Sequence, residues 1–305
     1  MIFIQLATYL SILTAFIAMA VKAFRYISAP QHFRWELYPV PHEKGRSDYG
    51  GSYLEELDWW SKPRQSDKLN ELLEMMSEIF FLKGVLHNNK RVWLSSFPFH
   101  LGLYCSIGWL LLLLGGGILQ IFDIAISANG GFLGIIVYYA TVFFGYFGLI
   151  LTALGAFGLV LWRAANKRQR VYNSPSDYIN LLLFDIVIVI ALISQYIYDP
   201  YFTILRDYVI SLITFSSFSS PGLFFSAEIV LVALLIMYIT LTRMSHFVAK
   251  FFLYHSVRWN DEPNFKGSKI EANLLKLLEH KVGWSAPHIQ TGKKWSEVVK
   301  ENNNE

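Results

Sequence analysis

Long apolar blocks with few charges dominate the pattern of this chain. A helix needs roughly 20 apolar residues to cross a bilayer core of about 30 Å. Five blocks reach that length, so the sequence predicts an all-α, integral-membrane fold, a five-helix transmembrane bundle with a cytoplasmic loop and tail. The predicted transmembrane helices are 3–26, 93–121, 132–162, 178–199 and 222–252.

The apolar stretch 201–220 is harder to assign, because it is rich in serine, threonine and aromatic residues. Pro200 and Pro221 bracket it, and the pair Arg206 and Asp207 interrupts it. A half-inserted sixth segment is one interpretation. The charged pair and the prolines favour the other, a connector at the membrane interface.

Basic residues mark one side of the membrane. They are numerous in the loops 28–91 and 163–176 and in the tail after 252, whereas 122–131 has none and 200–221 has one. Because basic residues accumulate in cytoplasmic loops, this alternation predicts a multi-pass protein of the plasma membrane. Its N-terminus would lie outside and its C-terminus in the cytoplasm.

The same pattern predicts two parts. Residues 1–255 form the membrane domain, whose 28–91 loop carries an amphipathic helix from Ser66 to about Leu86. That helix would lie on the membrane surface, dock a cytoplasmic subunit, or do both. Residues 256–305 form a polar docking tail with a short helix at 269–280.

Composition narrows the class of protein. The chain has 305 residues, of which 54% are hydrophobic and only 16% charged, with a net charge of +3. Those values argue against a disordered protein, a nucleic-acid partner and an ordinary water-soluble enzyme. The single cysteine, Cys105, excludes a disulfide framework and an iron–sulfur cluster held by this chain alone.

Ionisable residues inside predicted spans are the candidates for function. His100 lies eight residues into the second span, about 12 Å of helix, and His246 lies six residues, about 9 Å, before Phe252. Two imidazoles at similar depth on two spans suit the axial positions of a haem iron. Arg243, three residues before His246, would anchor a haem propionate.

Alternatives remain open at this point. The two histidines could be isolated polar residues that bond across helices, and Met237 or Met244 could replace one of them as a ligand. Glycines along the second span, such as Gly102 and Gly108, leave room for a flat macrocycle or for a closely packed helix.

Two motifs make the chain resemble a known family. SSFPFHLGLY resembles the second helix of the gamma subunit of respiratory nitrate reductase, and LTRMSHF resembles its last helix. The 28–91 loop and the segment SAPHIQTGKKWSEV look more like the branch that includes membrane subunits of the sulfite-reduction and heterodisulfide reductase complexes. The resemblance covers most of residues 1–255. It implies b haem held by His100 and His246.

The family pattern has two haems and four histidines, and this chain departs from it. Leu110 and Glu228 stand where the second pair is expected, so one haem b is predicted and the outer quinol site is in doubt. Glu228 would be an exposed glutamate at a helix mouth or a proton-accepting group for quinol. Asp185, near the predicted haem depth, ranks above Glu228 as a quinone-linked proton group.

These observations together predict a membrane cytochrome b subunit of a respiratory complex. It would pass electrons between menaquinone and a cytoplasmic iron–sulfur subunit, which by resemblance is of the heterodisulfide reductase type. It would be an oxidoreductase as a subunit, with no catalytic centre beyond the haem and a quinone site. The alternative is a haem-free membrane anchor or assembly subunit. A transporter fits less well, because no internal repeat or broken span is evident.

Overall fold

A computed structural model describes residues 2–29, 37–48 and 50–302 and confirms the all-α fold class. Residues 30–36 and 49 of the predicted cytoplasmic loop lie outside this description. Within the described ranges there are isolated β-bridges but no strand. The α-helices are α1 Ile2–Ile27, α2 Lys68–Phe80, α3 Lys83–Asn88, α4 Lys90–Ile121, α5 Phe132–Ala165, α6 Lys167–Tyr172, α7 Pro175–Tyr198, α8 Thr203–Thr214, α9 Leu223–Leu241, α10 His246–Leu253, α11 Lys269–Leu278 and α12 Trp295–Asn302.

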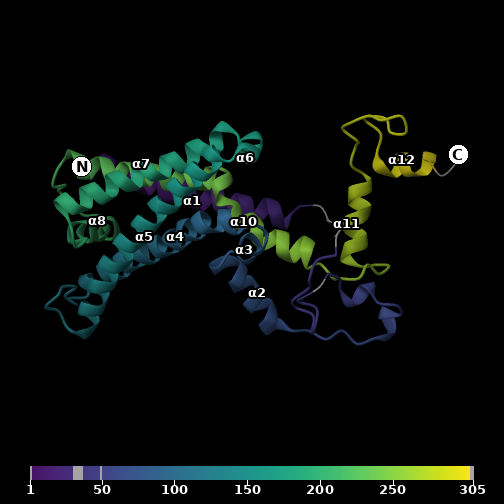
Figure 1. Cartoon of the computed structure of the whole chain (residues 1–305), viewed down its shortest axis with the longest axis horizontal. Coiled ribbons are helices and arrows are strands. Elements are labelled where there is room, and N and C mark those ends of the chain that lie inside the picture. Colours follow the sequence, from purple (N-terminus) through teal and green to yellow (C-terminus); the bar gives the residue numbers. More distant parts are fainter. Residues whose placement is uncertain (1, 30–36, 49, 303–305) are drawn as a thin grey trace. The chain divides into compact units, whose positions relative to one another are not determined.

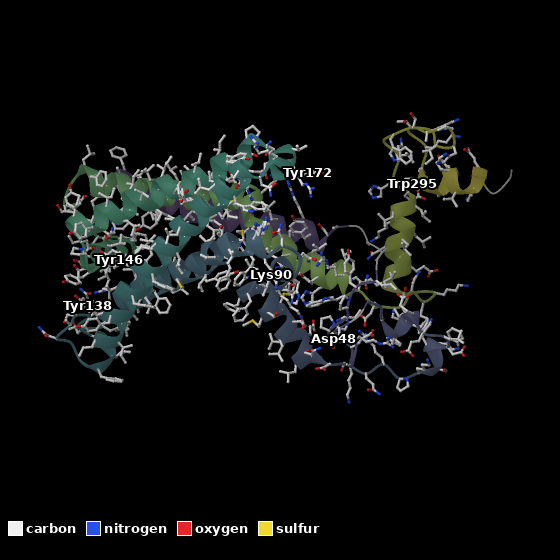
Figure 2. All side chains as sticks on the ribbon, in the orientation of Figure 1. Asp48, Lys90, Tyr138, Tyr146, Tyr172 and Trp295 are labelled. Atoms are coloured by element: carbon white, nitrogen blue, oxygen red, sulfur yellow. The ribbon has the colours of Figure 1, made fainter. Side chains whose placement is uncertain are left out.

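Five of these helices are long and apolar enough to cross a membrane: α1, α4, α5, α7 and α9. Each lies where the sequence predicts a span. Figure 2 shows mainly carbon on the side chains that surround these long helices. Such apolar surfaces are costly in water and match the interior of a bilayer, so the chain is a membrane protein.

The fifth span differs from its prediction, because the helix does not continue to residue 252. α9 ends at Leu241, Thr242 is extended, and a 3-10 turn over Arg243–Ser245 precedes α10. The Ser245 hydroxyl donates to the carbonyls of Thr240 and Thr242, at 3.3 and 3.0 Å. Hydroxyl side chains that bond nearby backbone compete with helical hydrogen bonds. The break follows a span of full length rather than interrupting it.

The chain forms two compact units, which are described separately. The first comprises Met1–Ala18 and Met75–Ser245, and the second comprises Met19–Glu74 and His246–Glu305. The predicted parts, 1–255 and 256–305, are continuous in sequence, whereas each of these units combines two separate segments that contact one another.

The first unit is built on the pair α4 and α5, which lie side by side in Figure 1. A Cβ atom at Gly102 would overlap the backbone of Thr152, and one at Gly148 would lie 2.8 Å from the Ser106 nitrogen. Small residues let helix backbones approach this closely in membranes. The space beside Gly102 is therefore filled by the closely packed helix α5, whereas Gly108 faces open space.

Helices α7 and α9 complete the core of this unit. One buried apolar cluster joins the four helices, and it contains Phe99 from α4, Ala156 from α5, Phe184 and Val187 from α7 and Leu235 from α9. These side chains alternate along each helix with exposed apolar residues that face outward. The bundle thus has a packed interior and an apolar exterior.

The connector after α7 is a helix of 12 residues, α8, and is too short to span a bilayer. It begins after Phe202, and the Asp199 carboxylate accepts from the backbone N–H groups of Thr203 and Leu205, both at 2.7 Å. Arg206 on α8 is only 1% exposed and donates to the Ile126 carbonyl at 3.1 Å. The connector is therefore packed against the bundle rather than lying loose at its surface.

The predicted amphipathic helix from Ser66 to Leu86 is present but broken. α2 ends at Phe80, and Leu82 adopts a left-handed conformation with φ of 52° before α3 begins. The indole of Trp93 donates to the Phe81 carbonyl at 2.8 Å, which holds this corner.

The tail of the second unit contains more order than its composition suggests. α11 matches the helix predicted at 269–280, while α12 was not predicted. Val282, Ile289 and Val298 form a small core beneath Trp295.

Candidate functional sites

His100 is held in one orientation by its own helix. Its Nδ1 lies 2.7 Å from the Ser96 carbonyl oxygen, one turn earlier in α4. A carbonyl only accepts hydrogen bonds, so Nδ1 carries the proton and the lone pair of the neutral ring is at Nε2. This is the arrangement in which imidazole ligates a metal through Nε2. The donor chemistry at His100 therefore fits an axial haem ligand.

His246 belongs to the second unit, where it is the exposed first residue of α10. His246 and Phe252 lie six positions apart in one helix, α10, so the helical distance counted from Phe252 holds. Arg243 belongs to the preceding 3-10 turn, so it and His246 do not lie on one continuous α-helix.

Arg243 is 77% exposed at its side chain and lies beside the beginning of α7. Its Nη2 donates to the Ser176 hydroxyl at 3.0 Å and lies 3.8 Å from a carboxylate oxygen of Asp177. A guanidinium has five N–H donors. Arg243 is thus an exposed cation with the chemistry to hold a second carboxylate.

Asp185 lies on α7 with both carboxylate oxygens buried, and neither has a hydrogen-bond partner within the described part of the chain. Its chain neighbour Phe184 is in the apolar core. Buried polar atoms in proteins are nearly always paired. Asp185 is therefore an unpaired, buried acidic group of the fourth span among the described residues.

Glu228 is not the exposed glutamate that the sequence suggested, because only 2% of it is exposed. α9 packs against α7 here, and the Gln195 side-chain amide donates to Glu228 Oε1 at 2.7 Å. The expectation was wrong because hydropathy along one helix does not reveal which face a neighbouring helix covers.

Several buried polar residues were missed by the sequence analysis. Ser194, Gln195, Asp199 and Arg206 are each at most 2% exposed. The available signal was the polar pair Ser194 and Gln195 inside an otherwise apolar span. Polar residues at such positions mark contacts within a membrane bundle.

The second unit contains a buried ionic cluster that the sequence analysis also missed. One ligand atom each from His42, Glu43 and Asp261 lies within 4.8 Å of the others, a spacing that could hold a metal ion. His42 Nε2 lies 2.9 Å from Asp261 Oδ2, and Arg64 also bonds that oxygen. Ser52 and the Tyr53 N–H bond the Glu43 carboxylate at 2.7 and 2.8 Å. The cluster is already paired, so it joins two chain segments without needing a cation.

Burial, hydrogen bonds and neighbouring charges together shift the pKa values of the Glu43 and Asp261 carboxyls. Burial alone would raise the pKa of Asp261, but hydrogen bonds from His42 and Glu43 and the charge of Arg64 outweigh it and lower that pKa. Burial raises the pKa of Glu43, and the bond to Asp261 raises it further.

Replacing Asp261 by asparagine is expected to loosen this cluster. Removing one member of a buried ion pair costs roughly 3 kcal/mol here, the low end of the usual range, because Arg64 is 40% exposed. Since the folded pKa of Asp261 is lowered, its contribution exists above the ordinary value of about 3.9 and disappears as pH falls through the folded value. Hydrogen exchange of residues 37–48 and 50–66 measures the opening.

The neighbouring Glu262 is exposed and provides the matched control, since Glu262→Gln removes the same charge beside the cluster. Equal exchange in both variants at neutral pH would contradict a stabilising role for Asp261.

Comparisons with protein-family models, curated proteins and solved structures found no match to this chain. The fold and the sites define an integral-membrane α-helical bundle with unpaired polar groups inside it.

Proposed function

We propose that this chain is the membrane cytochrome b subunit of a respiratory oxidoreductase complex. It passes electrons between menaquinone and a cytoplasmic iron–sulfur subunit. The observation that carries the proposal is the imidazole of His100, oriented on a span helix by the 2.7 Å contact of Nδ1 with the Ser96 carbonyl. An imidazole fixed through Nδ1 presents Nε2 as a metal ligand.

A single haem b would supply the one-electron carrier within the membrane. His100 and His246 are its two proposed axial ligands, and Arg243 is the proposed partner of a propionate. Arg243 suits that role because it is exposed and already lies beside a carboxylate, that of Asp177. Leu110 and Glu228 occupy the positions where a second haem would need histidines.

The partner subunit follows from the cysteine count. One cysteine cannot hold an iron–sulfur cluster, so the clusters that exchange electrons with this chain belong to another protein. By resemblance that protein is an iron–sulfur subunit of the heterodisulfide reductase type. The 28–91 loop and the 256–305 tail are its proposed docking elements, on the cytoplasmic face of a plasma membrane with the N-terminus outside.

Quinone chemistry also needs proton carriers, because quinol oxidation releases protons together with electrons. Asp185 is the first candidate, since both of its carboxylate oxygens are buried without a partner among the described residues and could accept from a quinol hydroxyl. Glu228 is the second candidate, and it is the more buried of the two.

A spectrum of the purified protein tests this function directly. Dithionite-reduced minus oxidised difference spectra should show the α-band of a b-type haem, and haem analysis should give one haem per chain. Absence of the band would favour the second candidate, a haem-free anchor or assembly subunit, for which the intrahelical bond of His100 is a sufficient role. A ratio near two would refute the single haem and implicate a further histidine such as His87 or His255.

A further inference from the structure

Three buried side chains of the first unit carry unpaired oxygens on the facing helices α7 and α9. Ser194 and Gln195 have no exposed surface, and Glu228 is 2% exposed. The Gln195 amide nitrogen donates to Glu228 Oε1 at 2.7 Å, and Ser194 is a further polar neighbour of Glu228. Glu228 Oε2, Gln195 Oε1 and Ser194 Oγ have no hydrogen-bond partner among the described residues.

A Glu228 carboxylate that is charged and has no counter-charge would strongly destabilise the folded protein at this buried position. Burying an ionised carboxylate without a counter-charge is among the most unfavourable events in a protein interior. Gln195 and Ser194 are neutral, so they cannot cancel its charge. Neutralisation must come from a basic side chain, a bound metal ion or a proton.

Arg206 is a buried basic side chain whose Nε and Nη2 have no hydrogen-bond partner among the described residues, but it is not one of the groups that act on Glu228. Arg206 on α8 donates to the Ile126 carbonyl at 3.1 Å and interacts electrostatically with Asp199 and Asp207. Asp199, at the end of α7, adds negative charge near Glu228 rather than removing it. Tyr208 on α8 is neutral and bonds Thr8 on α1 at 2.7 Å. None of these groups supplies a cation to Glu228.

The small number of unpaired protein oxygens at this site favours a proton over a metal ion. Calcium takes six to eight oxygen ligands, and magnesium takes six. Three unpaired side-chain oxygens are offered here, since the carbonyls of α7 and α9 serve their own helices. A proton needs one oxygen, and a buried water can join the remaining polar atoms.

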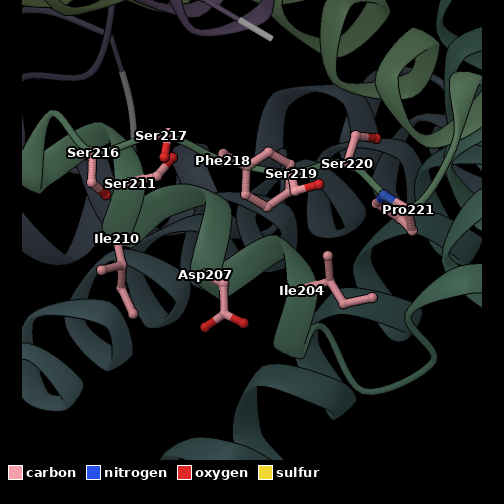
Figure 3. Close-up of a pocket in the computed structure, with 10 residues that line it drawn as sticks. All are labelled: Ile204, Asp207, Ile210, Ser211, Ser216, Ser217, Phe218, Ser219, Ser220 and Pro221. Carbon is pink, nitrogen blue, oxygen red and sulfur yellow. The ribbon is translucent and has the colours of Figure 1, made fainter.

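We infer that Glu228 carries an exchangeable proton in a buried, hydrated site that it forms with Gln195 and Ser194. Water reaches this end of the bundle at a pocket of about 490 Å³ that includes Asp207 and Phe218 in its lining (Figure 3). Phe218 packs in one cluster with Phe225 and Ile229, which are neighbours of Glu228 on α9. The pocket therefore borders the apolar cluster beside Glu228 and is the proposed source of water for exchange. The inference requires neither haem nor quinone, so it can hold even if the proposed function, in which Glu228 is the second candidate proton carrier, fails.

Dicyclohexylcarbodiimide provides a test, because this lipid-soluble reagent modifies protonated carboxyl groups in apolar surroundings. The full chain in lipid nanodiscs is treated across a pH series, and peptides are analysed by mass spectrometry. We expect an adduct on the peptide that contains Glu228, and less of it as pH rises. Glu228→Gln should lose this adduct, whereas Asp185→Asn should keep it, because it removes a carboxyl from α7 and leaves Glu228 intact.

An infrared measurement keeps the inference testable if a variant folds poorly. In the wild-type protein, a protonated carboxyl at Glu228 gives a C=O stretching band that shifts in D₂O. Glu228→Gln should remove this band, and Ser194→Ala should shift it by removing one polar neighbour. A wild-type protein without an adduct at Glu228 overturns the inference, as does a carboxyl band that stays in place in D₂O.

Discussion

Replacing His100 by glycine is expected to abolish the b-type band of the purified protein, and added imidazole is expected to restore it. The reason is that Nε2 carries the lone pair of the ring, and so is the proposed iron ligand, when Nδ1 bonds the Ser96 carbonyl. Glycine at position 100 removes the ring without adding a side chain, so free imidazole can occupy the same space. The reduced-minus-oxidised spectrum and the haem content measure both effects.

A purely structural role for His100 would give a different result. Loss of a helix-stabilising contact could lower protein yield, but free imidazole would not bring back an absorption band. His87 on α3 is an exposed histidine and provides the matched control, because His87→Gly should leave the band unchanged. If the band persists in His100→Gly, another residue ligates the iron and the proposed site is wrong.

Replacing Gly102 by alanine is expected to lower the stability of the membrane helices at the contact between α4 and α5. The added methyl group would overlap the backbone nitrogen of Thr152 and approach the Gly148 carbonyl oxygen to 2.8 Å, and backbone atoms cannot rotate away. Overpacking of this kind costs about 1–3 kcal/mol, occasionally more. The apparent melting temperature in detergent should fall.

Gly108 on the same helix is the control, since a Cβ atom there would meet nothing within 4 Å. Gly108→Ala should be neutral, or stabilising by up to about 1 kcal/mol through the higher helix propensity of alanine. Similar melting temperatures for the two variants would contradict the close contact between α4 and α5.

The helices were predictable because their signal is local. A run of about 20 apolar residues is stable as a helix in a bilayer whatever its neighbours in the fold. For that reason α1, α4, α5 and α7 lie where the sequence predicts them. The break after Leu241 was not predicted, because it depends on which carbonyls the Ser245 hydroxyl reaches. Hydropathy averages over such single contacts.

The candidate sites were predictable to different degrees. Asp185 stood out in the sequence as the one charge between Tyr178 and Tyr198, and the structure leaves both its carboxylate oxygens unpaired within the described residues. Glu228 was misjudged, since its burial comes from Gln195, 33 positions away on another helix. The pairing of Asp261 with His42 crosses more than 200 positions, and no pattern along the chain indicates it.

The sequence by itself determined that this is an all-α membrane protein and where its long helices lie. Composition and periodicity suffice for those conclusions, because each concerns one segment and its solvent. Only the tertiary structure decided which polar groups are buried together and which glycines are contacts rather than spaces. Those outcomes depend on the distances between helices. Side-chain packing sets these distances, whereas the uniformly apolar bilayer does not.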